Sequence, residues 1–515
     1  MSTGKRQPSR PRWWRRGAPA ALTGLAAAAA AIGAGELVAA FTGADSSPVL
    51  AVGSQAIDLT PTPLKDYAVR TFGTHDKFVL LSGIHATLVL LALAAGVLSA
   101  RWRPAGVAVF LLFAGVGAWV AAVRAVAVWP ALTAGTVGAV VLWWLSGLGR
   151  RACRSESSGP TRRTVLGATG GVLAVGVVAD LGGRALAGAR SSVAAARAGV
   201  RLPAPAHPGP ALPPRVHPDI AGLSPFTTAN RDFYRVDTAL TLPQIDPRRW
   251  SLRVHGMVDR PLELDFDQLL RLPLEELDYT LSCVSNEVGG PYVGTARWLG
   301  ASLPALLRRA GVRAGADQLV GRSKDHMSIG TPLDSVLDGR PALLAVGMNG
   351  EPLPVAHGFP CRSVVPGFYG YTSATKWLVD LEVTAFAAYS PYWVERGWDR
   401  HGVVRTASRI EVPAPFAHLR AGAVMVAGTA WATHRGIAAV EVRVDGGPWR
   451  QAHLAEAVGP DTWRQWTWEW ADAQPGTHTL QVRATDATGA TQPEQRQPPF
   501  PAGATGWHGI VAIVE

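Results

Sequence analysis

Cysteine is scarce in this chain, which has three cysteines in 515 residues. Cys153 lies in a basic stretch, Cys361 in "HGFPCRSVVPG" and Cys283 in "TLSCVSNEVGG". Three thiols exclude a disulfide framework, and no two of them stand at the C-x-x-C spacing of a zinc site. A single Cys283–Cys361 disulfide in an oxidising compartment stays open at this point.

Net charge is missing from most of the chain. The formal charge of +11 is concentrated in residues 1–16 and 150–163, and residues 164–515 carry no net charge. A neutral C-terminal part has no general attraction to phosphate backbones, so we expect no nucleic-acid partner. The basic residues flank apolar segments instead, where such charges set membrane orientation.

Long hydrophobic runs are present in the first part of the chain. Four of them, at about residues 17–43, 78–100, 104–123 and 128–148, approach the ~20 residues that cross a lipid bilayer. We interpret residues 1–149 as a four-helix transmembrane region. Basic residues precede the first run, separate the second from the third and follow the fourth, which predicts a multi-pass membrane protein with a cytoplasmic N-terminus.

Residues 150–188 hold a fifth apolar stretch of a different kind. Arg162 and Arg163 precede only about 16 apolar or small residues before Asp180, which is short for a span. "TRRTVLG" is similar to a twin-arginine export signal, so a signal or anchor helix is our first interpretation. A fifth transmembrane helix is the alternative. Both interpretations place everything after about residue 185 outside the cytoplasm.

Histidine is sparse in the membrane region. His75 and His85 are the only histidines before residue 200, whereas a membrane b-type haem takes paired axial histidines. We therefore predict no haem in this chain.

The rest of the chain divides into three segments by composition. Residues 189–218 are rich in Ala and Pro and are typical of a linker. Residues 219–405 mix alternating segments such as "WSLRVHGMV" with helical patterns such as "SLPALLRRAGV", which predicts an α+β domain. Residues 406–515 hold short alternating segments and the hairpin signal "VDGGPW", which predict an immunoglobulin-like β-sandwich.

Three tryptophans alternate along one predicted strand of the sandwich, at Trp466, Trp468 and Trp470. Side chains two residues apart in a strand share a face. We interpret that face as sandwich core or as an interface.

Cys283 has three readings from its chemistry alone. It could be an inert buried thiol, a nucleophile activated by a nearby base, or a soft thiolate ligand to a metal. A single cysteine without a spacing motif does not distinguish these three roles, so the surrounding residues must.

The stretch "CVSNEVGGPYVGTARWLGASLPALLRRAGV" resembles the sulfite oxidase family of molybdenum enzymes. A second block, "LLAVGMNGEPLPVAHGFPCRSVVPGFYGYTSATKWLVDLEV", is similar to a long run of that family, and "TTANRDFYRVDTAL" is similar to its first segment. The resemblance covers about residues 219–515 and leaves out residues 1–160. It implies that the sandwich is the family's dimerisation domain, so a homodimer through it is expected.

The resemblance implies a molybdenum atom held by one pterin dithiolene, with the Cys283 sulfur as its protein ligand. The catalytic residues would be Cys283, Asn286 and Arg435. The residues that would hold the molybdopterin cofactor match the family's motifs in several loops; they are Asn230, Tyr234, Cys283, Asp325, His357, Arg362, Ser373, Thr375 and Lys376.

The chain departs from the family's pattern where sulfite would bind. Sulfite oxidases hold the dianion with arginines, one of which follows the Cys-x-x-Asn turn, but here Glu287 and Val288 follow Asn286. A carboxylate about 4 Å from a like charge costs about 4 kcal/mol at an effective dielectric constant of 20. Trp398 stands near the position of the family's active-site tyrosine. The pocket is thus predicted to suit a neutral substrate better than a dianion.

We therefore expect a membrane-anchored, extracytoplasmic molybdopterin-dependent oxidoreductase that transfers an oxygen atom, with a sulfoxide or another small S- or N-oxide as substrate. A sulfite-type oxidase is the alternative within the same class. A non-catalytic, membrane-tethered binding module on a molybdopterin scaffold is the alternative of another class. Since no cytochrome domain is recognisable in the chain, electrons would pass through a separate haem or quinone-linked protein.

Overall fold

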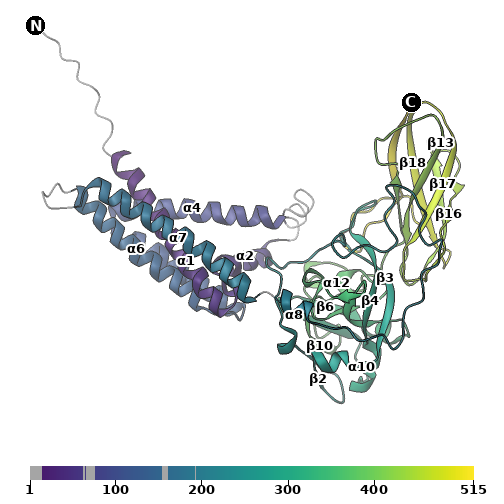
Figure 1. The fold of residues 1–515 in the computed structure, drawn as a ribbon, viewed down its shortest axis with the longest axis horizontal. Coiled ribbons are helices and arrows are strands. Elements are labelled where there is room, and N and C mark those ends of the chain that lie inside the picture. Colours follow the sequence, from purple (N-terminus) through teal and green to yellow (C-terminus); the bar gives the residue numbers. More distant parts are fainter. Residues whose placement is uncertain (1–13, 62–63, 65–75, 154–159, 192) are drawn as a thin grey trace, which may run out of the picture. The chain divides into compact units, whose positions relative to one another are not determined.

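The computed structural model describes residues 14–61, 64, 76–153, 160–191 and 193–515 (Figure 1). They form two compact units. The helical unit ends at Ser192 and also takes in Thr238–Thr241, and the β-rich unit comprises Val193–Asp237 and Leu242–Glu515. The prediction of membrane orientation drew on the basic N-terminal segment, the loop near residue 70 and the loop after Cys153. Much of these three segments lies outside the described residues.

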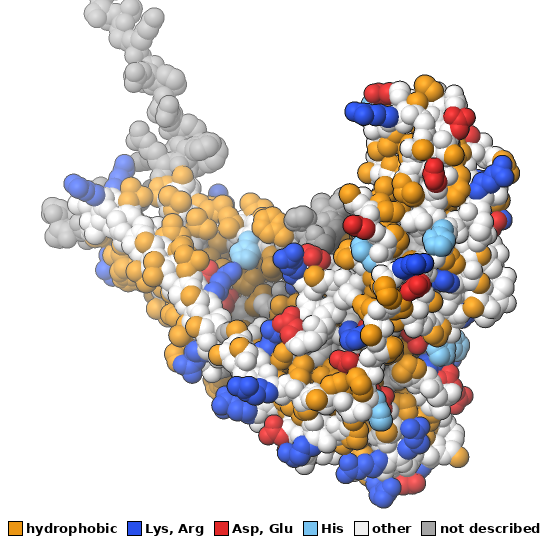
Figure 2. Space-filling model, turned by 45° about the vertical axis from the view of Figure 1, so that its right-hand side comes forward, with side chains coloured by type: hydrophobic (Ala, Val, Ile, Leu, Met, Phe, Trp, Pro, Cys, Tyr) orange, Lys and Arg blue, Asp and Glu red, His pale blue; other side chains and the backbone are white. Residues whose placement is uncertain are grey.

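The helical unit is built from long apolar helices. They are α1 (Trp14–Thr42), α4 (Asp76–Arg101), α5 (Arg103–Val123), α6 (Trp129–Cys153) and α7 (Arg162–Ser191), with η1 (Ala44–Ser46) and the shorter α2 (Pro48–Leu59). The four predicted runs coincide with α1, α4, α5 and α6. Together with α7, the described residues contain five helices long and apolar enough to cross a membrane. Figure 2 shows hydrophobic side chains covering the face of these helices that is in view.

Small residues let the helices approach closely. A Cβ at Gly24 of α1 would lie 1.9 Å from Ala92 O of α4, and one at Gly176 of α7 would lie 2.5 Å from the backbone of Ala29 in α1. Glycine is therefore required at these crossings, as is common where helices associate in an apolar environment.

The fifth apolar stretch forms a longer helix than the sequence suggested. α7 has 30 residues and continues beyond Asp180, whose carboxylate pairs with Arg184 Nε one turn later at 2.9 Å. The ion pair lets the helix run past a residue that we took as the end of the apolar segment. A helix of this length meets the requirement for a span, which was the alternative interpretation.

Helix α2 was not predicted. Ser47 caps it by accepting a hydrogen bond from Leu50 N, and Pro48 occupies its first turn. The Ser47 hydroxyl also donates to Glu36 Oε1 at 2.5 Å, and His85 Nδ1 contacts Leu81 O of its own helix. These contacts give Glu36 and His85 structural roles within the helical unit.

The α+β part of the β-rich unit contains two five-stranded sheets. The first has the order β2-β1-β10-β5-β6, with β1 and β10 parallel and the other neighbours antiparallel. Its strands are β1 (Ser251–Gly256), β2 (Leu262–Asp265), β5 (Gln318–Ser323), β6 (Ser328–Pro332) and β10 (Leu378–Thr384).

The second sheet has the order β3-β4-β7-β8, and β9 also pairs with β7. Its strands are β3 (Leu274–Ser282), β4 (Val293–Ser302), β7 (Leu343–Met348), β8 (Glu351–Pro352) and β9 (Arg362–Val364). Tyr279 and Trp298 are fully buried on it and anchor the core. The connecting helices are α9 (Phe266–Leu270), α10 (Leu303–Ala310), α11 (Leu333–Leu337) and α12 (Gly370–Ser373), with the 3-10 turns η3 (Pro247–Arg249), η4 (Val355–His357) and η5 (Val394–Arg396).

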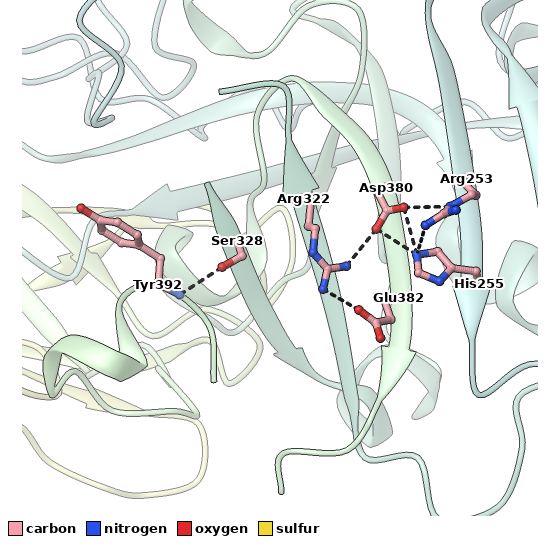
Figure 3. A network of polar contacts seen from close by, with 7 residues as sticks. All are labelled: Arg253, His255, Arg322, Ser328, Asp380, Glu382 and Tyr392. Carbon is pink, nitrogen blue, oxygen red and sulfur yellow. Dashed lines mark hydrogen bonds and ion pairs between the residues drawn. The ribbon is translucent and has the colours of Figure 1, made fainter. Parts of the chain in front are cut away.

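An ion-pair network links three strands of the first sheet (Figure 3). Asp380 of β10 accepts from Arg253 Nε at 3.1 Å and from Arg322 Nη1 at 2.9 Å, and it contacts His255 Nε2 at 2.9 Å. Arg322 also reaches Glu382 Oε2 at 2.5 Å. Each bond crosses between neighbouring strands, so the network stabilises their pairing.

The β-sandwich follows, as the sequence predicted. One sheet has the order β11-β13-β17-β16 and the other β12-β19-β18-β14-β15. The strands are β11 (Ala407–Val412), β12 (His418–Leu419), β13 (Gly422–Trp431), β14 (Ile437–Val444), β15 (Arg450–Gln451), β16 (His453–Leu454), β17 (Arg464–Ala473), β18 (Gly476–Asp486) and β19 (His508–Val514). Trp466 and Trp470 are buried in its core and Trp468 packs against it, so the core interpretation of this face is confirmed.

The predicted linker at residues 189–218 is tied down from Val193 onward. Val193 is buried in the α+β core, and α8 (Ala194–Ala198) follows it. Arg197 Nε donates to Leu353 O at 2.8 Å, and His207 N donates to Leu274 O at 3.2 Å. The Pro-rich chain is extended and runs along the α+β part, so it does not behave as a free linker.

Candidate active site

Cys283 follows β3, in a tight loop. Its N–H donates to Tyr292 O at 2.9 Å and its carbonyl accepts from Asn286 N at 3.1 Å. The residue is 9% exposed. Burial raises the pKa of the Cys283 thiol, although hydrogen bonds from Ser285 and the charge of Lys376 oppose this. The thiolate form therefore needs a positive partner such as a metal ion.

Cys361 is a structural thiol. It is fully buried, and burial alone raises its pKa. Cys283 and Cys361 are both free, so the disulfide left open from the sequence is not formed. Among the described residues, no group of three or more His, Cys, Asp or Glu side chains could hold a metal ion, so a metal at Cys283 would need further ligands from a cofactor.

Asn286 shapes the Cys283 loop. Its Oδ1 accepts from Tyr292 N at 2.8 Å, which closes the loop. A Cβ at Gly290 would lie 2.5 Å from this Oδ1, so glycine is needed there. The structure gives Asn286 Nδ2 no acceptor among the described residues, which leaves the amide free to act as a donor.

Arg362 on β9 is a buried cation without a counter-ion. It is 3% exposed, its Nη1 donates to His357 O at 3.0 Å and its guanidinium lies 4.9 Å from the Trp298 ring centroid. Its Nε has no hydrogen-bond partner, and no described carboxylate pairs with it. Burial lowers the pKa of Arg362 to about 10. A bound anion such as a phosphate would remove the cost of this unpaired charge.

Lys376 lies close to Arg362 because both pack against Gly358. A Cβ at Gly358 would lie 3.1 Å from Arg362 Cβ and from Lys376 Cα, and the glycine has φ +112°. Lys376 Nζ pairs with Asp237 Oδ2 at 2.8 Å. Burial lowers the pKa of Lys376 to about 8, against the opposing charge of Asp237. The sequence did not point to Asp237, which lies 139 residues from its partner.

His357 and Asn230 meet, as two predicted cofactor-binding residues. His357 Nε2 lies 3.1 Å from Asn230 O. Burial lowers the pKa of His357 to about 4, so the imidazole is neutral. The Asn230 side chain donates to Met348 O at 3.1 Å and to Glu351 Oε1 at 2.6 Å. It therefore fastens the first segment to β7 and β8.

Tyr234 lies between this group and Cys283. Its ring stacks on Phe233 at a centroid distance of 5.4 Å and lies 6.3 Å from the Tyr292 ring. Burial raises the pKa of Tyr234, and the nearby Cys283 thiolate raises it further. The phenol is therefore protonated and can donate a hydrogen bond.

Ser373 and Thr375 are held by a serine that the sequence analysis missed. Ser363 Oγ donates to Ser373 O at 3.1 Å and accepts from Thr375 N at 2.8 Å. The Ser373 hydroxyl donates to Tyr369 O at 3.0 Å. The loop that carries these two predicted cofactor-binding residues is thus held against β9 by Ser363, to which its Thr375 amide is already bonded.

Asp325 lies in the turn between β5 and β6, beside the strand that follows Lys376. Lys324 N donates to Trp377 O at 2.9 Å, which brings the turn to that strand. Asp325 Oδ1 and Ser323 Oγ are buried without hydrogen-bond partners. Together with Arg362 Nε, they are the orphaned polar atoms that a bound pterin and its phosphate would satisfy. The residues present therefore fit the cofactor.

Arg435 is engaged within the sandwich. Its Nε donates to Asp486 Oδ2 at 2.8 Å, and its Nη2 donates to Val404 O at 3.0 Å and Thr406 Oγ1 at 3.1 Å. No described contact joins Arg435 to Cys283 or Asn286. The Asp486 carboxylate balances its charge, and Nε and Nη2 are already bonded. The predicted contact with substrate would therefore have to use the remaining nitrogen of the guanidinium.

Two of the three positions that depart from the family's pattern line a small cavity, and the third, Trp398, lies outside its lining. Glu287, which is exposed, and Val288, which is half-buried, line it together with Asn286. Trp398 is 7% exposed and packs against Phe500 and Tyr371, at centroid distances of 5.3 and 5.8 Å. Its indole N–H has no partner in the described residues.

Two family models match the β-rich unit. Residues 239–393 match the oxidoreductase molybdopterin binding domain, and residues 408–482 match the bacterial Ig domain. Both predicted domain types are thereby confirmed.

Curated relatives point the same way. The chain is 32% identical to mitochondrial sulfite oxidase of Rattus norvegicus over 286 residues, which are 47% of this chain and 52% of that protein. It is 32% identical to sulfite oxidase of Gallus gallus over 336 residues, 55% of this chain and 72% of that protein. The chain thus spans about half the length of the rat enzyme and more of the chicken one.

Among solved structures, the sulfane dehydrogenase SoxCD of Paracoccus pantotrophus matches 54% of this chain and 80% of its own, at 26% identity and a TM-score of 0.46. NADH nitrate reductase of Solanum lycopersicum is 26% identical over 317 residues, 49% of this chain and 35% of that protein. The molybdopterin-binding domain, together with the matches to sulfite oxidase and nitrate reductase, implies a molybdenum–molybdopterin cofactor and an oxidoreductase. The chain therefore belongs to the sulfite oxidase family of molybdopterin-dependent oxidoreductases.

Proposed function

We propose that this enzyme removes the oxygen atom from a small neutral oxide, with a sulfoxide as the preferred class. The observation that carries the proposal is that the described residues place neither of the two expected arginines as a free cation beside Cys283. Arg435 is already paired with Asp486, and Glu287 and Val288 follow the Cys-x-x-Asn turn, where an arginine is expected. A neutral oxide needs hydrogen-bond donors, which Asn286 Nδ2 can supply.

The cofactor-binding residues have separate tasks in this proposal. Cys283 would hold the metal, Arg362 and Lys376 would face the anionic pterin end, and Asp325 and Ser323 would accept or donate hydrogen bonds at the pterin ring. His357, Asn230 and Tyr234 would form the wall between them. When bound, the molybdenum–pterin group supplies two-electron oxygen-atom transfer, which no side chain of the protein can provide. The overall reaction consumes two electrons and two protons and yields the sulfide and water.

The reducing equivalents would come from a separate haem or quinone-linked protein, and the helical unit would anchor the enzyme in a membrane with the β-rich unit outside the cytoplasm. The five apolar helices with exposed apolar side chains support the anchor. Because molybdopterin is inserted in the cytoplasm, a loaded domain would cross the membrane folded, which fits the paired arginines at the start of α7. Changing Arg162 and Arg163 to Lys should leave active enzyme unexported, and unchanged export would reduce them to topogenic charges.

Sulfite oxidation is the second candidate. It is favoured by the relatives, of which several are sulfite oxidases at about one third identity. The non-catalytic binding module has no such support.

One experiment separates the two candidates. Molybdenum-loaded protein is assayed for methionine sulfoxide reduction with a reduced viologen and for sulfite oxidation with ferricyanide. We expect the first activity to exceed the second, and sulfite turnover without sulfoxide turnover would reject the proposal.

A substitution sharpens the test. Val288→Arg restores the expected cation, so it should raise the ratio of sulfite to sulfoxide turnover. Met425→Arg is the matched control, because it adds the same charge on an exposed position of β13 in the sandwich. An equal change in both variants would mean that net charge, and not the pocket, sets the preference.

A further inference from the structure

The small cavity beside the Cys283 loop is lined from both parts of the β-rich unit. Its volume is about 20 Å³, which is room for a water molecule or a group of that size. Ser282 and Asn286 flank Cys283 and line the cavity, Tyr369 lines it from the segment after β9, and Ser408 lines it from the sandwich. The cavity is therefore next to the metal ligand and too small for a whole substrate, but large enough for one oxygen atom.

Two hydroxyl groups of the lining residues have unused hydrogen-bonding capacity. Ser282 is fully buried and its Oγ has no partner in the described part of the chain. Tyr369 is 5% exposed, and its Oη accepts a hydrogen bond from Arg405 N at 3.2 Å. No acceptor among the described residues receives the phenolic proton. Buried polar groups are normally satisfied, so these two point to a polar guest in the cavity.

The chain makes room for the Tyr369 hydroxyl. Gly503 has φ +92°, and a Cβ there would lie 2.4 Å from Tyr369 Oη. Burial raises the pKa of Tyr369 to about 12, although the hydrogen bond and the charge of Arg405 oppose this. The phenol is therefore held in place with its proton on the oxygen.

We propose that this cavity receives the oxygen atom of the substrate and that Tyr369 donates the hydrogen bond that holds it. The assignment rests on the proposed function, because it takes an oxide as substrate. It makes Tyr369 a catalytic residue. Tyr369 would then supply the phenol that the family's active-site tyrosine would provide, since Trp398 stands near that tyrosine's position in this chain. The hydrogen bond strengthens as negative charge builds on the departing oxygen, and Tyr369 itself is not consumed.

The test compares two tyrosines two residues apart. Tyr369→Phe removes the phenol from the cavity, whereas Tyr371→Phe removes a half-buried phenol that donates to Asp399 O at 2.6 Å and does not line the cavity. We expect kcat/KM for methionine sulfoxide to fall on the order of 10- to 100-fold in Tyr369→Phe, mainly through kcat. The kcat/KM of Tyr371→Phe for methionine sulfoxide should stay close to that of the wild type when the two proteins have equal molybdenum content.

Two further measurements guard the test. Ser282→Ala should lower kcat/KM by about three- to tenfold, which keeps the assignment testable if Tyr369→Phe does not fold. Binding of dimethyl sulfoxide to the oxidised, resting enzyme is measured by calorimetry, as a readout without turnover. Tyr369→Phe should weaken it by about tenfold, and Tyr371→Phe should not.

The outcomes separate this assignment from the proposed function. Wild-type turnover of sulfite alone would reject the proposed function, and the same variants are then compared with sulfite, whose product leaves with the transferred oxygen. A selective loss in Tyr369→Phe supports the assignment with either substrate. Equal losses in the two tyrosine variants, or wild-type kinetics and binding in both Tyr369→Phe and Ser282→Ala, would overturn it and leave a cavity that holds water only.

Discussion

The two parts of the β-rich unit treat their buried charges differently. In the sandwich, the buried Asp486 carboxylate accepts from Arg435, Thr406 and Thr488. In the α+β part, the equally buried Arg362 has no carboxylate beside it and keeps an unpartnered Nε. Both parts are β-rich and tightly packed, so packing does not explain the difference.

The kind of orphaned atom also differs between the parts. Among the described residues, the sandwich leaves only the neutral Thr433 Oγ1 and Trp466 Nε1 without partners, whereas the α+β part leaves atoms of the ionisable Arg362 and Asp325. A region whose charges are paired is complete as a folded chain. A region with buried, unpaired charges is completed by a ligand. The comparison thus supports, without reference to any relative, the placement of the proposed cofactor pocket in the α+β part.

The largest effect should come from the metal ligand. Cys283→Ser replaces a thiolate donor by a hydroxyl, so oxygen-transfer activity should fall below detection while the circular dichroism spectrum and melting temperature of the β-rich unit are kept. Cys361→Ser is the control, because it buries a hydroxyl in place of a thiol elsewhere. It should cost roughly 1–3 kcal/mol of stability and leave activity per molybdenum unchanged. Measurable turnover in Cys283→Ser would contradict the assigned ligand.

Replacing a buried arginine with methionine should change the free energy of unfolding with opposite sign in the two parts. Arg362→Met removes a buried, unpaired cation, so it should stabilise the cofactor-free protein by roughly 1–4 kcal/mol while abolishing cofactor retention. Arg435→Met leaves the buried Asp486 carboxylate with its hydrogen-bond donors Thr406 and Thr488 but without its cation, which should cost roughly 3–5 kcal/mol. Denaturant unfolding of cofactor-free protein measures both. Destabilisation in both variants would show that Arg362 has a partner in the chain itself.

Acid should weaken the sandwich at Asp486. Burial alone would raise the pKa of Asp486, but hydrogen bonds from Thr488, Arg435 and Thr406 outweigh it and lower the pKa to about 2. Because the folded pKa lies below the unfolded value of about 4, the stability that this group contributes is present above pH ~4 and is lost as the pH falls towards 2. Asp486→Asn should show a smaller loss of melting temperature over that window, and an unchanged acid profile would contradict the assignment.

The smallest effect is expected at the network of Figure 3. Glu382 and Arg322 are about one quarter and one third exposed, and such pairs contribute roughly 0.2–1 kcal/mol. Glu382→Gln should therefore change the free energy of unfolding by no more than that, and the difference should shrink in high salt. A larger loss of unfolding free energy that does not depend on salt would show that this pair behaves as a buried ion pair.

Sequence patterns predicted the local elements well. Apolar runs long enough to cross a bilayer became α1, α4, α5 and α6, since length and hydropathy are properties of the chain itself. Alternation predicted the sandwich and the core position of Trp466, because a strand has a period of two. Motifs singled out Cys283 and Arg362 before any contact was known.

Some features escaped the sequence because they depend on tertiary contacts. Asp237 pairs with Lys376, 139 residues away. Ser363 bonds Ser373 and Thr375 across a turn, through contacts that no local pattern encodes. The stretch from Val193 to residue 218 has the composition of a linker, but hydrogen bonds to other strands tie it to the unit.

The sequence alone determined which residues could serve as metal ligand, cation or span, because those capacities are set by side-chain chemistry and by runs of neighbouring residues. Only the tertiary structure decided which charges are paired. Arg435 and Arg362 are the same side chain in sequence, and they differ because folding brings a carboxylate to one and leaves the other buried without one.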